Sequence, residues 1–242
     1  MDWSAPCRGG YIRAMDGYGQ FCPVAVASEI FTRRWTPLVL RELLAGSTHF
    51  NEIRRGLPRI SRTTLATRLR ELERAGVLCC IAGGVAGQST YRLTAAGREF
   101  AAVIDALGAW GQRWTQRINA ANLDPSLLMW NLRRRIELQR LPARRVVVQF
   151  EFENVPARAS RDRSFWLILE PPQADLCIRD PGYDTDLTVR ADLRAFTAVW
   201  LGELHWIDAL RRGSVRIAGP RGLARDFPGW LQLSRFAAVP RH

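Results

Sequence analysis

Hydrophobic residues recur at helical spacing through the first half of the chain, after a glycine-rich start at residues 1–21 that predicts a flexible arm. Four helices are expected to begin at Pro23, Thr36, His49 and Ser61, with Thr36 and Ser61 acting as N-caps. Strands over 77–82 and 88–93 flank a glycine-rich tip at 83–87 and predict a hairpin. A long helix capped by Thr94 is expected to run to about residue 118, which closes a first domain over 22–118.

The pattern changes beyond residue 118. A helical bridge is expected over 119–142, beginning at Asp124-Pro125 and ending at Pro142. Apolar residues then alternate from Val146 to Phe152, which predicts a strand. Further strands are expected over 164–170, 174–179, 185–190 and 214–218, and helices over 193–201, 203–212 and 220–236. Strands and helices segregated in this way predict an α+β domain over 143–242, and an α+β fold class for the chain.

Composition adds one strong signal, which is charge. Apolar residues make up 47% and charged residues 24% of the 242-residue chain, as in ordinary globular proteins. No apolar run reaches the length of a membrane span, and the N-terminus lacks the apolar core of a signal peptide, so a cytoplasmic protein with no membrane partner is expected. The formal charge of +12 comes entirely from arginine, because the chain has no lysine, and it favours a polyanionic partner.

Arginine is concentrated in residues 54–74, where seven arginines face only Glu71 and Glu73. The helix beginning at Ser61 has one apolar seam, formed by Leu65, Leu69 and Leu72. Such a helix can bury its seam and present its N-terminal residues to base edges in the major groove. A solvated helix face is the simpler alternative, but three short helices, a basic fourth helix and a glycine-tipped hairpin together predict a winged helix-turn-helix.

The polar residues of this region fall into two groups, candidates for contact with bases and candidates for contact with phosphates. Arginine donates two hydrogen bonds to guanine, and threonine can bond to a base or touch a thymine methyl group. The candidates for base contact are Arg62, Thr63, Thr64 and Thr67, behind the N-cap Ser61. The candidates for phosphate contact are Arg54, Arg55, Arg59, Arg68 and Arg70.

Residues 22–114 resemble the HxlR family of bacterial winged-helix regulators. The matching stretches are Cys22-Pro23-Val24, Arg34-Trp35-Thr36 before LVLRELL, HFNEIRRGLPRIS, LATRLRELERAGVL, STYRLTAAGREF and AWGQRW. The resemblance implies a homodimer on double-stranded DNA with an inverted-repeat operator, contacted by the helix from Ser61 and the hairpin 77–93. Family hairpins often carry a charged tip, whereas residues 83–87 contain no charge. The apolar helix 94–118, which carries Phe100, Val103, Leu107, Trp110 and Trp114, is the expected dimer seam.

Cys22 precedes an expected helix, where the N-terminus can lower the pKa of a thiol. It occupies the position at which some HxlR-like regulators carry a cysteine that senses oxidants or electrophiles. A buried, inert cysteine is the alternative reading. Five cysteines with no repeated spacing and three scattered histidines indicate neither a disulfide framework nor a metal site, and no cofactor is expected.

Residues 145–236 resemble the sterol-carrier-protein-like fold, through the stretch from Asp184 to Leu231. Proteins of that fold hold lipids or other apolar molecules between sheet and helices. Seven aromatic residues are the candidate lining of such a ligand site, or else an ordinary core: Phe165, Trp166, Phe196, Trp200, Trp206, Phe227 and Trp230. A hydrophobic or aromatic effector of DNA binding is therefore expected.

Three classes of function follow from these observations. The leading prediction is a dimeric, sequence-specific DNA-binding regulator with an effector domain, and a regulator that senses through Cys22 is its variant. A lipid-binding module with a structural winged helix is the second class, which the arginine-threonine helix disfavours. An enzyme is the third, and we expect none, because the sequence has no nucleophile elbow, phosphate loop or metal-ligand cluster.

Overall fold

The computed structural model describes residues 17–83, 88–115, 118–157, 159 and 162–241. The chain separates into two compact units, Met1–Gly108 and Ala109–His242, hereafter the N-terminal and C-terminal units. The division falls inside the long helix, ten residues before the predicted end of the first domain. In the described part of the chain, no helix is long and apolar enough to cross a membrane.

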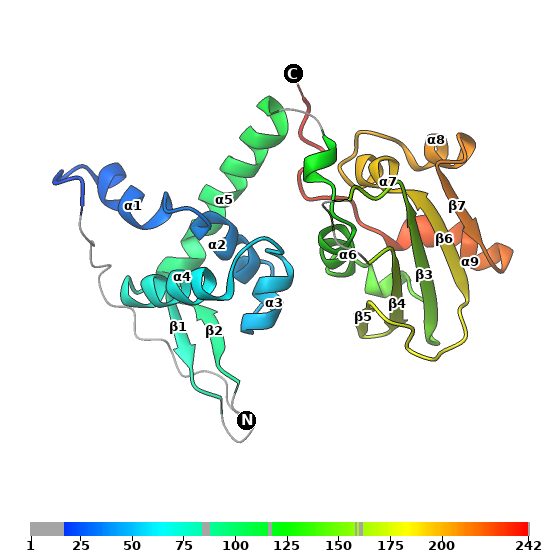
Figure 1. Ribbon diagram of the computed structural model, residues 1–242, viewed down its shortest axis with the longest axis horizontal. Coiled ribbons are helices and arrows are strands. Elements are labelled where there is room, and N and C mark those ends of the chain that lie inside the picture. The colour runs from blue at the N-terminus through cyan, green and yellow to red at the C-terminus, as the bar shows by residue number, and fades with distance from the viewer. Residues whose placement is uncertain (1–16, 84–87, 116–117, 158, 160–161, 242) are drawn as a thin grey trace. The chain divides into compact units, whose positions relative to one another are not determined.

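In the described part of the N-terminal unit, the chain begins with four helices, as predicted, and Figure 1 shows their arrangement. They are α1 (Pro23–Phe31), α2 (Thr36–Leu44), α3 (Phe50–Arg55) and α4 (Arg62–Arg74). The Ser61 cap is confirmed, since its Oγ accepts a hydrogen bond from the Thr64 N–H at 3.0 Å. The Thr36 cap is wrong: Thr36 is buried and helical, and Trp35 precedes the helix in the left-handed conformation, with φ of 79°.

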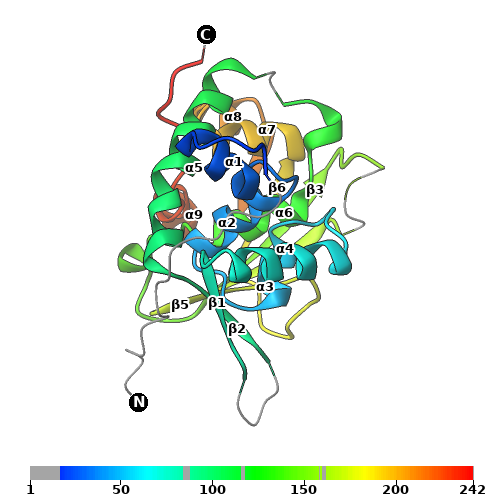
Figure 2. The same cartoon turned by 90° about the vertical axis from the view of Figure 1, so that its left-hand side faces the viewer.

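An antiparallel hairpin follows α4, formed by β1 (Leu78–Ile81) and β2 (Thr90–Leu93). Figure 2 shows the hairpin extending beyond α3 and α4. The tip residues 84–87 lie outside the described residues. The Thr94 Oγ1 accepts a hydrogen bond from the Gly97 N–H at 3.1 Å, which confirms Thr94 as the cap of α5 (Ala95–Trp114). Helix α5 ends four residues earlier than predicted.

Aliphatic residues make up the buried core of the N-terminal unit. The leucine seam of α4 is confirmed, because Leu65, Leu69 and Leu72 are all buried. Phe31 and Phe100 stack at its edge, with ring centroids 5.5 Å apart. Burial of the seam fixes the rotation of α4 about its axis, and so determines which side chains face outward.

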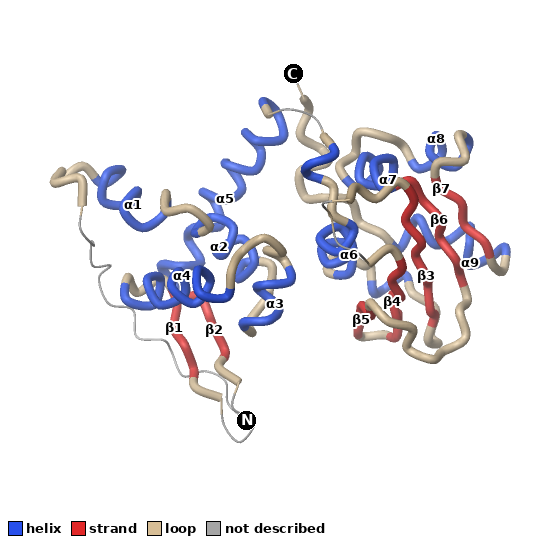
Figure 3. The backbone as a smooth tube through the Cα atoms, viewed as in Figure 1, coloured by secondary structure: helices blue, strands red, loops and turns tan. Residues whose placement is uncertain are grey.

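A five-stranded mixed sheet forms the centre of the C-terminal unit (Figure 3). Its strands are β3 (Val146–Glu153), β4 (Ser164–Glu170), β5 (Gln173–Cys177), β6 (Leu187–Asp192) and β7 (Val215–Ala218), in the order β5-β4-β3-β6-β7. Only the β3–β6 pair is parallel. All five strands were predicted, and the alternation along β3 puts Val146, Val148, Phe150 and Phe152 into the core.

Helices pack around this sheet. They are α6 (Pro125–Arg133), α7 (Leu193–Trp200), α8 (Trp206–Arg211) and α9 (Arg221–Asp226), with 3-10 turns at Ala120–Asn122, Leu138–Arg140 and Phe227–Trp230. Asp124 and Asp192 cap α6 and α7, because each carboxylate accepts a hydrogen bond from a backbone N–H three residues on.

Two further helix ends differ from the prediction. The bridge helix stops at Arg133 rather than Pro142, because the following residues pair with the end of the chain: the Glu137 N–H donates to the Trp230 carbonyl at 2.8 Å. The last helix does not run over 220–236. It ends at Asp226 and gives way to a 3-10 turn at Pro228, which has no N–H to continue the helix.

Candidate nucleic-acid interface

The exposed face of α4 carries the predicted base-contacting residues. Arg62 and Thr63 are exposed on the first turn, and Thr64 and Thr67 are half-buried. The Thr64 hydroxyl is 2.8 Å from the Ser61 Oγ, so part of its hydrogen-bonding capacity is used within the cap. Arg62 and Thr63 are therefore the residues of this group with the greatest access to a base edge.

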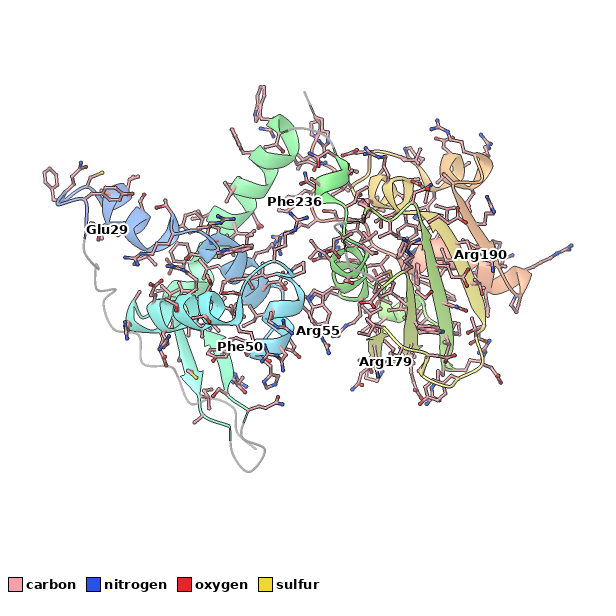
Figure 4. The ribbon with its side chains drawn as sticks, in the orientation of Figure 1. Glu29, Phe50, Arg55, Arg179, Arg190 and Phe236 are labelled. Atoms are coloured by element: carbon pink, nitrogen blue, oxygen red, sulfur yellow. The ribbon has the colours of Figure 1, made fainter. Side chains whose placement is uncertain are left out.

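Most of the predicted phosphate contacts are exposed around this helix. Arg54 and Arg55 lie in the last turn of α3, and Arg55 is labelled in Figure 4. Arg59 lies between α3 and α4, and Arg70 lies on the outer side of α4. These four arginines give the face formed by α3 and α4 a positive charge, which suits a phosphate backbone.

Arg68 differs from the other arginines. Its side chain is only 19% exposed, and it forms an ion pair with Glu71 one turn further along α4. Glu71 also accepts a hydrogen bond from Arg33 at 3.2 Å, and the Nε of Arg33 in turn donates to the Glu29 carbonyl of α1. The sequence does not predict this network, because nothing local to Glu71 indicates a partner 38 residues away. Arg68 is thus held against the protein rather than extended toward solvent.

The hairpin is the second element that was predicted to contact DNA. Its register pairs Cys79 with Arg92 and Cys80 with Tyr91. The Tyr91 N–H also donates to the Thr48 carbonyl at 2.7 Å, which ties β2 to the start of α3. Burial raises the pKa of the Tyr91 phenol, and the neighbouring Cys80 and Glu73 add to that rise. Tyr91 is therefore a neutral packing residue at neutral pH.

Cys22 is exposed at the N-cap of α1. The backbone N–H groups of Ala25 and Val24 face its sulfur and lower the pKa of the thiol. The alternative of a buried cysteine is therefore wrong for this position. An accessible thiol with a lowered pKa has the properties that thiolate chemistry requires.

A stripe of apolar side chains is exposed along α5. Val103, Leu107, Trp110 and Trp114 recur at spacings of four, three and four residues, and Trp110 is 58% exposed. A helix face of this kind is typical of a surface that pairs with another helix. Phe100, the fifth predicted seam residue, instead packs against Phe31 inside the N-terminal unit.

The seven aromatic candidates of the C-terminal unit pack into its interior or onto its sheet. Phe165, Phe196, Phe227 and Trp230 are buried, and Trp206 touches both Phe196 and Phe227, with ring centroids 5.6 and 6.3 Å away. Trp166 is half-buried, paired with Gln149 across β3 and β4, and Trp200 ends α7. The structure brings four of the seven into one chain of ring contacts: Phe196, Trp206, Phe227 and Trp230.

Known proteins identify the N-terminal unit. A family model described as HxlR-like helix-turn-helix matches residues 30–119. YdeP of Bacillus subtilis, an uncharacterized HTH-type transcriptional regulator, is 35% identical over 99 residues, covering 40% of this chain and 77% of YdeP. YvaP of the same organism is 32% identical over 111 residues, covering 45% of this chain and 95% of YvaP. The chain belongs to the HxlR-like helix-turn-helix family.

HxlR-like proteins are transcription regulators rather than enzymes, and the chain is accordingly a DNA-binding transcription regulator. Among solved structures, the redox regulator HypR in its reduced form is 28% identical, covers 38% of this chain and 91% of its own, and has a TM-score of 0.36. The HxlR-like match ends at residue 119, so the sheet of the C-terminal unit lies beyond it.

Proposed function

We propose that the chain is a homodimeric, sequence-specific regulator that reads an inverted-repeat operator through α4. The observation that carries this proposal is the orientation of α4: its leucine seam is buried, which leaves Arg62 and Thr63 exposed on the first turn beside the arginines of α3. The N-terminal turns of a recognition helix are where base edges are contacted in helix-turn-helix proteins.

The apolar stripe of α5 supports the dimer. Two copies pairing along Val103, Leu107 and Trp110 would cover side chains that water otherwise contacts. A two-fold dimer would contact half-sites about one DNA turn apart, roughly 34 Å.

Gel-shift titration against the protein's own promoter region tests specific binding. Arg62→Ala should weaken specific binding by about 1–3 kcal/mol and relax sequence preference if Arg62 contacts a guanine. Arg55→Ala is the matched control, because loss of a phosphate contact weakens binding to specific and random DNA alike. Wild-type binding no tighter to the promoter than to random DNA would refute sequence-specific recognition.

The C-terminal unit is proposed to be a sterol-carrier-like effector domain. Its support is a mixed sheet with helices packed on one face: Phe196 of α7 and Phe227 of the turn Phe227–Trp230 contact Phe150 of β3. Trp206 of α8 contacts Phe196 in turn. An effector alters operator affinity only if it binds the DNA-competent and DNA-incompetent states with different affinities. Coupling of this kind typically amounts to about 1–3 kcal/mol.

Cys22 supports a second candidate input, redox or electrophile sensing. The thiol is exposed and its pKa is lowered by backbone N–H groups, so oxidants can reach a thiolate there. Cys22→Ser should abolish any loss of operator binding on oxidation. An oxidation response that survives this substitution would exclude Cys22 as the sensor.

A further inference from the structure

A hollow of about 530 Å³ lies inside the C-terminal unit, away from the aromatic residues that the sequence suggested as a ligand site. Its walls come from the end of α5, from α7 and the turn after it, from Arg212 at the end of α8, and from residues 237–241. Figure 4 labels Phe236, the residue just before that last wall. Sites for small molecules commonly enclose about 300–1,000 Å³.

The polar side chains of this hollow are two arginines, one glutamate and one glutamine. Arg241 pairs with Glu203 and donates a hydrogen bond to the Gln112 Oε1 at 3.2 Å. The Nε of Arg241 is buried and has no hydrogen-bond partner among the described residues. Arg212 contributes a second guanidinium, and it is exposed. Two guanidinium groups against one carboxylate leave a net positive charge, which favours an anionic ligand.

The rest of the lining is aliphatic. Leu201, Leu204 and Val239, with the alanines 198, 237 and 238, contribute the apolar wall, and among the described residues no aromatic ring lines it. Such a wall suits a flexible aliphatic chain better than a flat ring that needs a stacking partner. We propose that this hollow binds a small molecule with a carboxylate head and an aliphatic body, the head facing Arg212 and Arg241.

Gln112 connects this site to α5. It lies two residues from both Trp110 and Trp114, which places it about 200° around the helix from the exposed stripe, given 3.6 residues per turn. A ligand at Gln112 therefore contacts the side of α5 that the proposed dimer leaves uncovered. Control of operator binding by this ligand rests on the proposed function, because only a DNA-binding protein can transmit the contact at Gln112 to an operator.

Octanoate is a suitable probe for the site, with octanol and octylamine as chain-matched controls for the head group. Calorimetric titration of the full-length protein without DNA should show saturable octanoate binding, weaker octanol binding and no octylamine binding. Failure to bind octanoate at millimolar concentration, or equal binding of octylamine, would overturn the proposal.

Substitution of two neighbouring arginines, one at a time, tests whether octanoate binds in this hollow. Arg212→Gln should weaken octanoate binding about tenfold and leave octanol binding unchanged, because only the head group loses a partner. Arg211→Gln is the control, since Arg211 is exposed on the same helix and does not line the hollow. Equal loss in both variants would place octanoate elsewhere. Promoter affinity is measured separately: a protein that binds octanoate but not DNA refutes the proposed function and leaves the site intact.

Discussion

The two units of this chain bury different kinds of side chain. The buried core of the N-terminal unit is aliphatic, formed by leucine, isoleucine, valine and alanine. The C-terminal unit buries Phe150, Phe165, Phe196 and Phe227 at its centre. In the first unit the charged surface suggests the function directly. In the second, five of the seven aromatic residues that suggested a ligand site contact other rings: Phe165, Phe196, Trp206, Phe227 and Trp230.

The contacts between elements differ accordingly. Leucines and other aliphatic residues fill the core between the helices of the first unit, whereas large rings lie between the helices and the sheet of the second. Phe196 meets Phe150, Phe152 and Trp206 edge to face, with centroids 5.6–5.8 Å apart. Edge-to-face pairs of this kind add to the stabilisation that area burial provides. Aromatic richness in this unit therefore indicates a packed core, and ligand chemistry has to be sought at polar groups around hollows.

The largest expected effect is a loss of stability, and it tests whether the aromatic residues form a packed core. Phe196→Ala should destabilise the C-terminal unit by about 3–5 kcal/mol, because it removes a fully buried ring that touches three others. Denaturant unfolding measures the shift. Ile207→Ala, on the exposed surface of α8, should stay within about 0.5 kcal/mol. A small loss at Phe196 with altered binding of an apolar ligand would instead indicate a ligand cavity lined by that ring.

The surface of the N-terminal unit should behave in the opposite way, changing assembly rather than folding. Leu107→Glu places a carboxylate in the apolar stripe of each copy and should raise the dimer dissociation constant on the order of 30-fold, about 2 kcal/mol. Light scattering at micromolar concentration measures this change. Ala102→Glu adds the same charge to an exposed position about 140° around α5 from Leu107 and should leave assembly unaltered. A wild-type protein that is monomeric would refute the dimer itself.

The helix caps, the leucine seam and the strands could be predicted because each depends on residues close together in the sequence. Ser61, Asp124 and Asp192 are caps whose partners lie three residues away, and the seam of α4 needs only the helical period. The strands follow from alternation and turns for the same reason. These features depend on a few neighbouring residues, so their positions follow from the pattern alone.

Long-range contacts explain what the sequence could not predict. The bridge helix stops early because residues near Glu137 pair with Trp230, almost one hundred positions further along the chain. The hollow beside Arg241 draws its lining from four separated segments, and the bond between Gln112 and Arg241 spans 129 residues. No periodicity or motif joins such segments, so the site exists only once the chain has folded.

A smaller effect is expected from the network around Glu71, within the proposed DNA-binding face. Glu71→Gln should release Arg68 from its ion pair, and a released arginine beside DNA can neutralise one further phosphate. The slope of log affinity against log salt should then become steeper by about 0.9. Glu73→Gln is the control with the same change in charge, since Glu73 makes no ion pair with Arg68 among the described residues. Equal slopes in both variants would mean that Arg68 stays out of reach of DNA.

The smallest expected effect concerns the thiol at the surface of the N-terminal unit. The N–H groups of Ala25 and Val24 lower the pKa of Cys22 in the folded chain, so its thiolate is present at a lower pH than in the unfolded chain. Alkylation by iodoacetamide follows the thiolate, and its rate against pH should therefore have a lower midpoint for folded than for unfolded protein. Mass spectrometry of the Cys22 peptide measures both rates, and because Cys22 is exposed in the fold, access does not explain a difference. Coincident midpoints would show that the helix start does not activate the thiol, and would leave the hollow of the C-terminal unit as the stronger candidate for signal input.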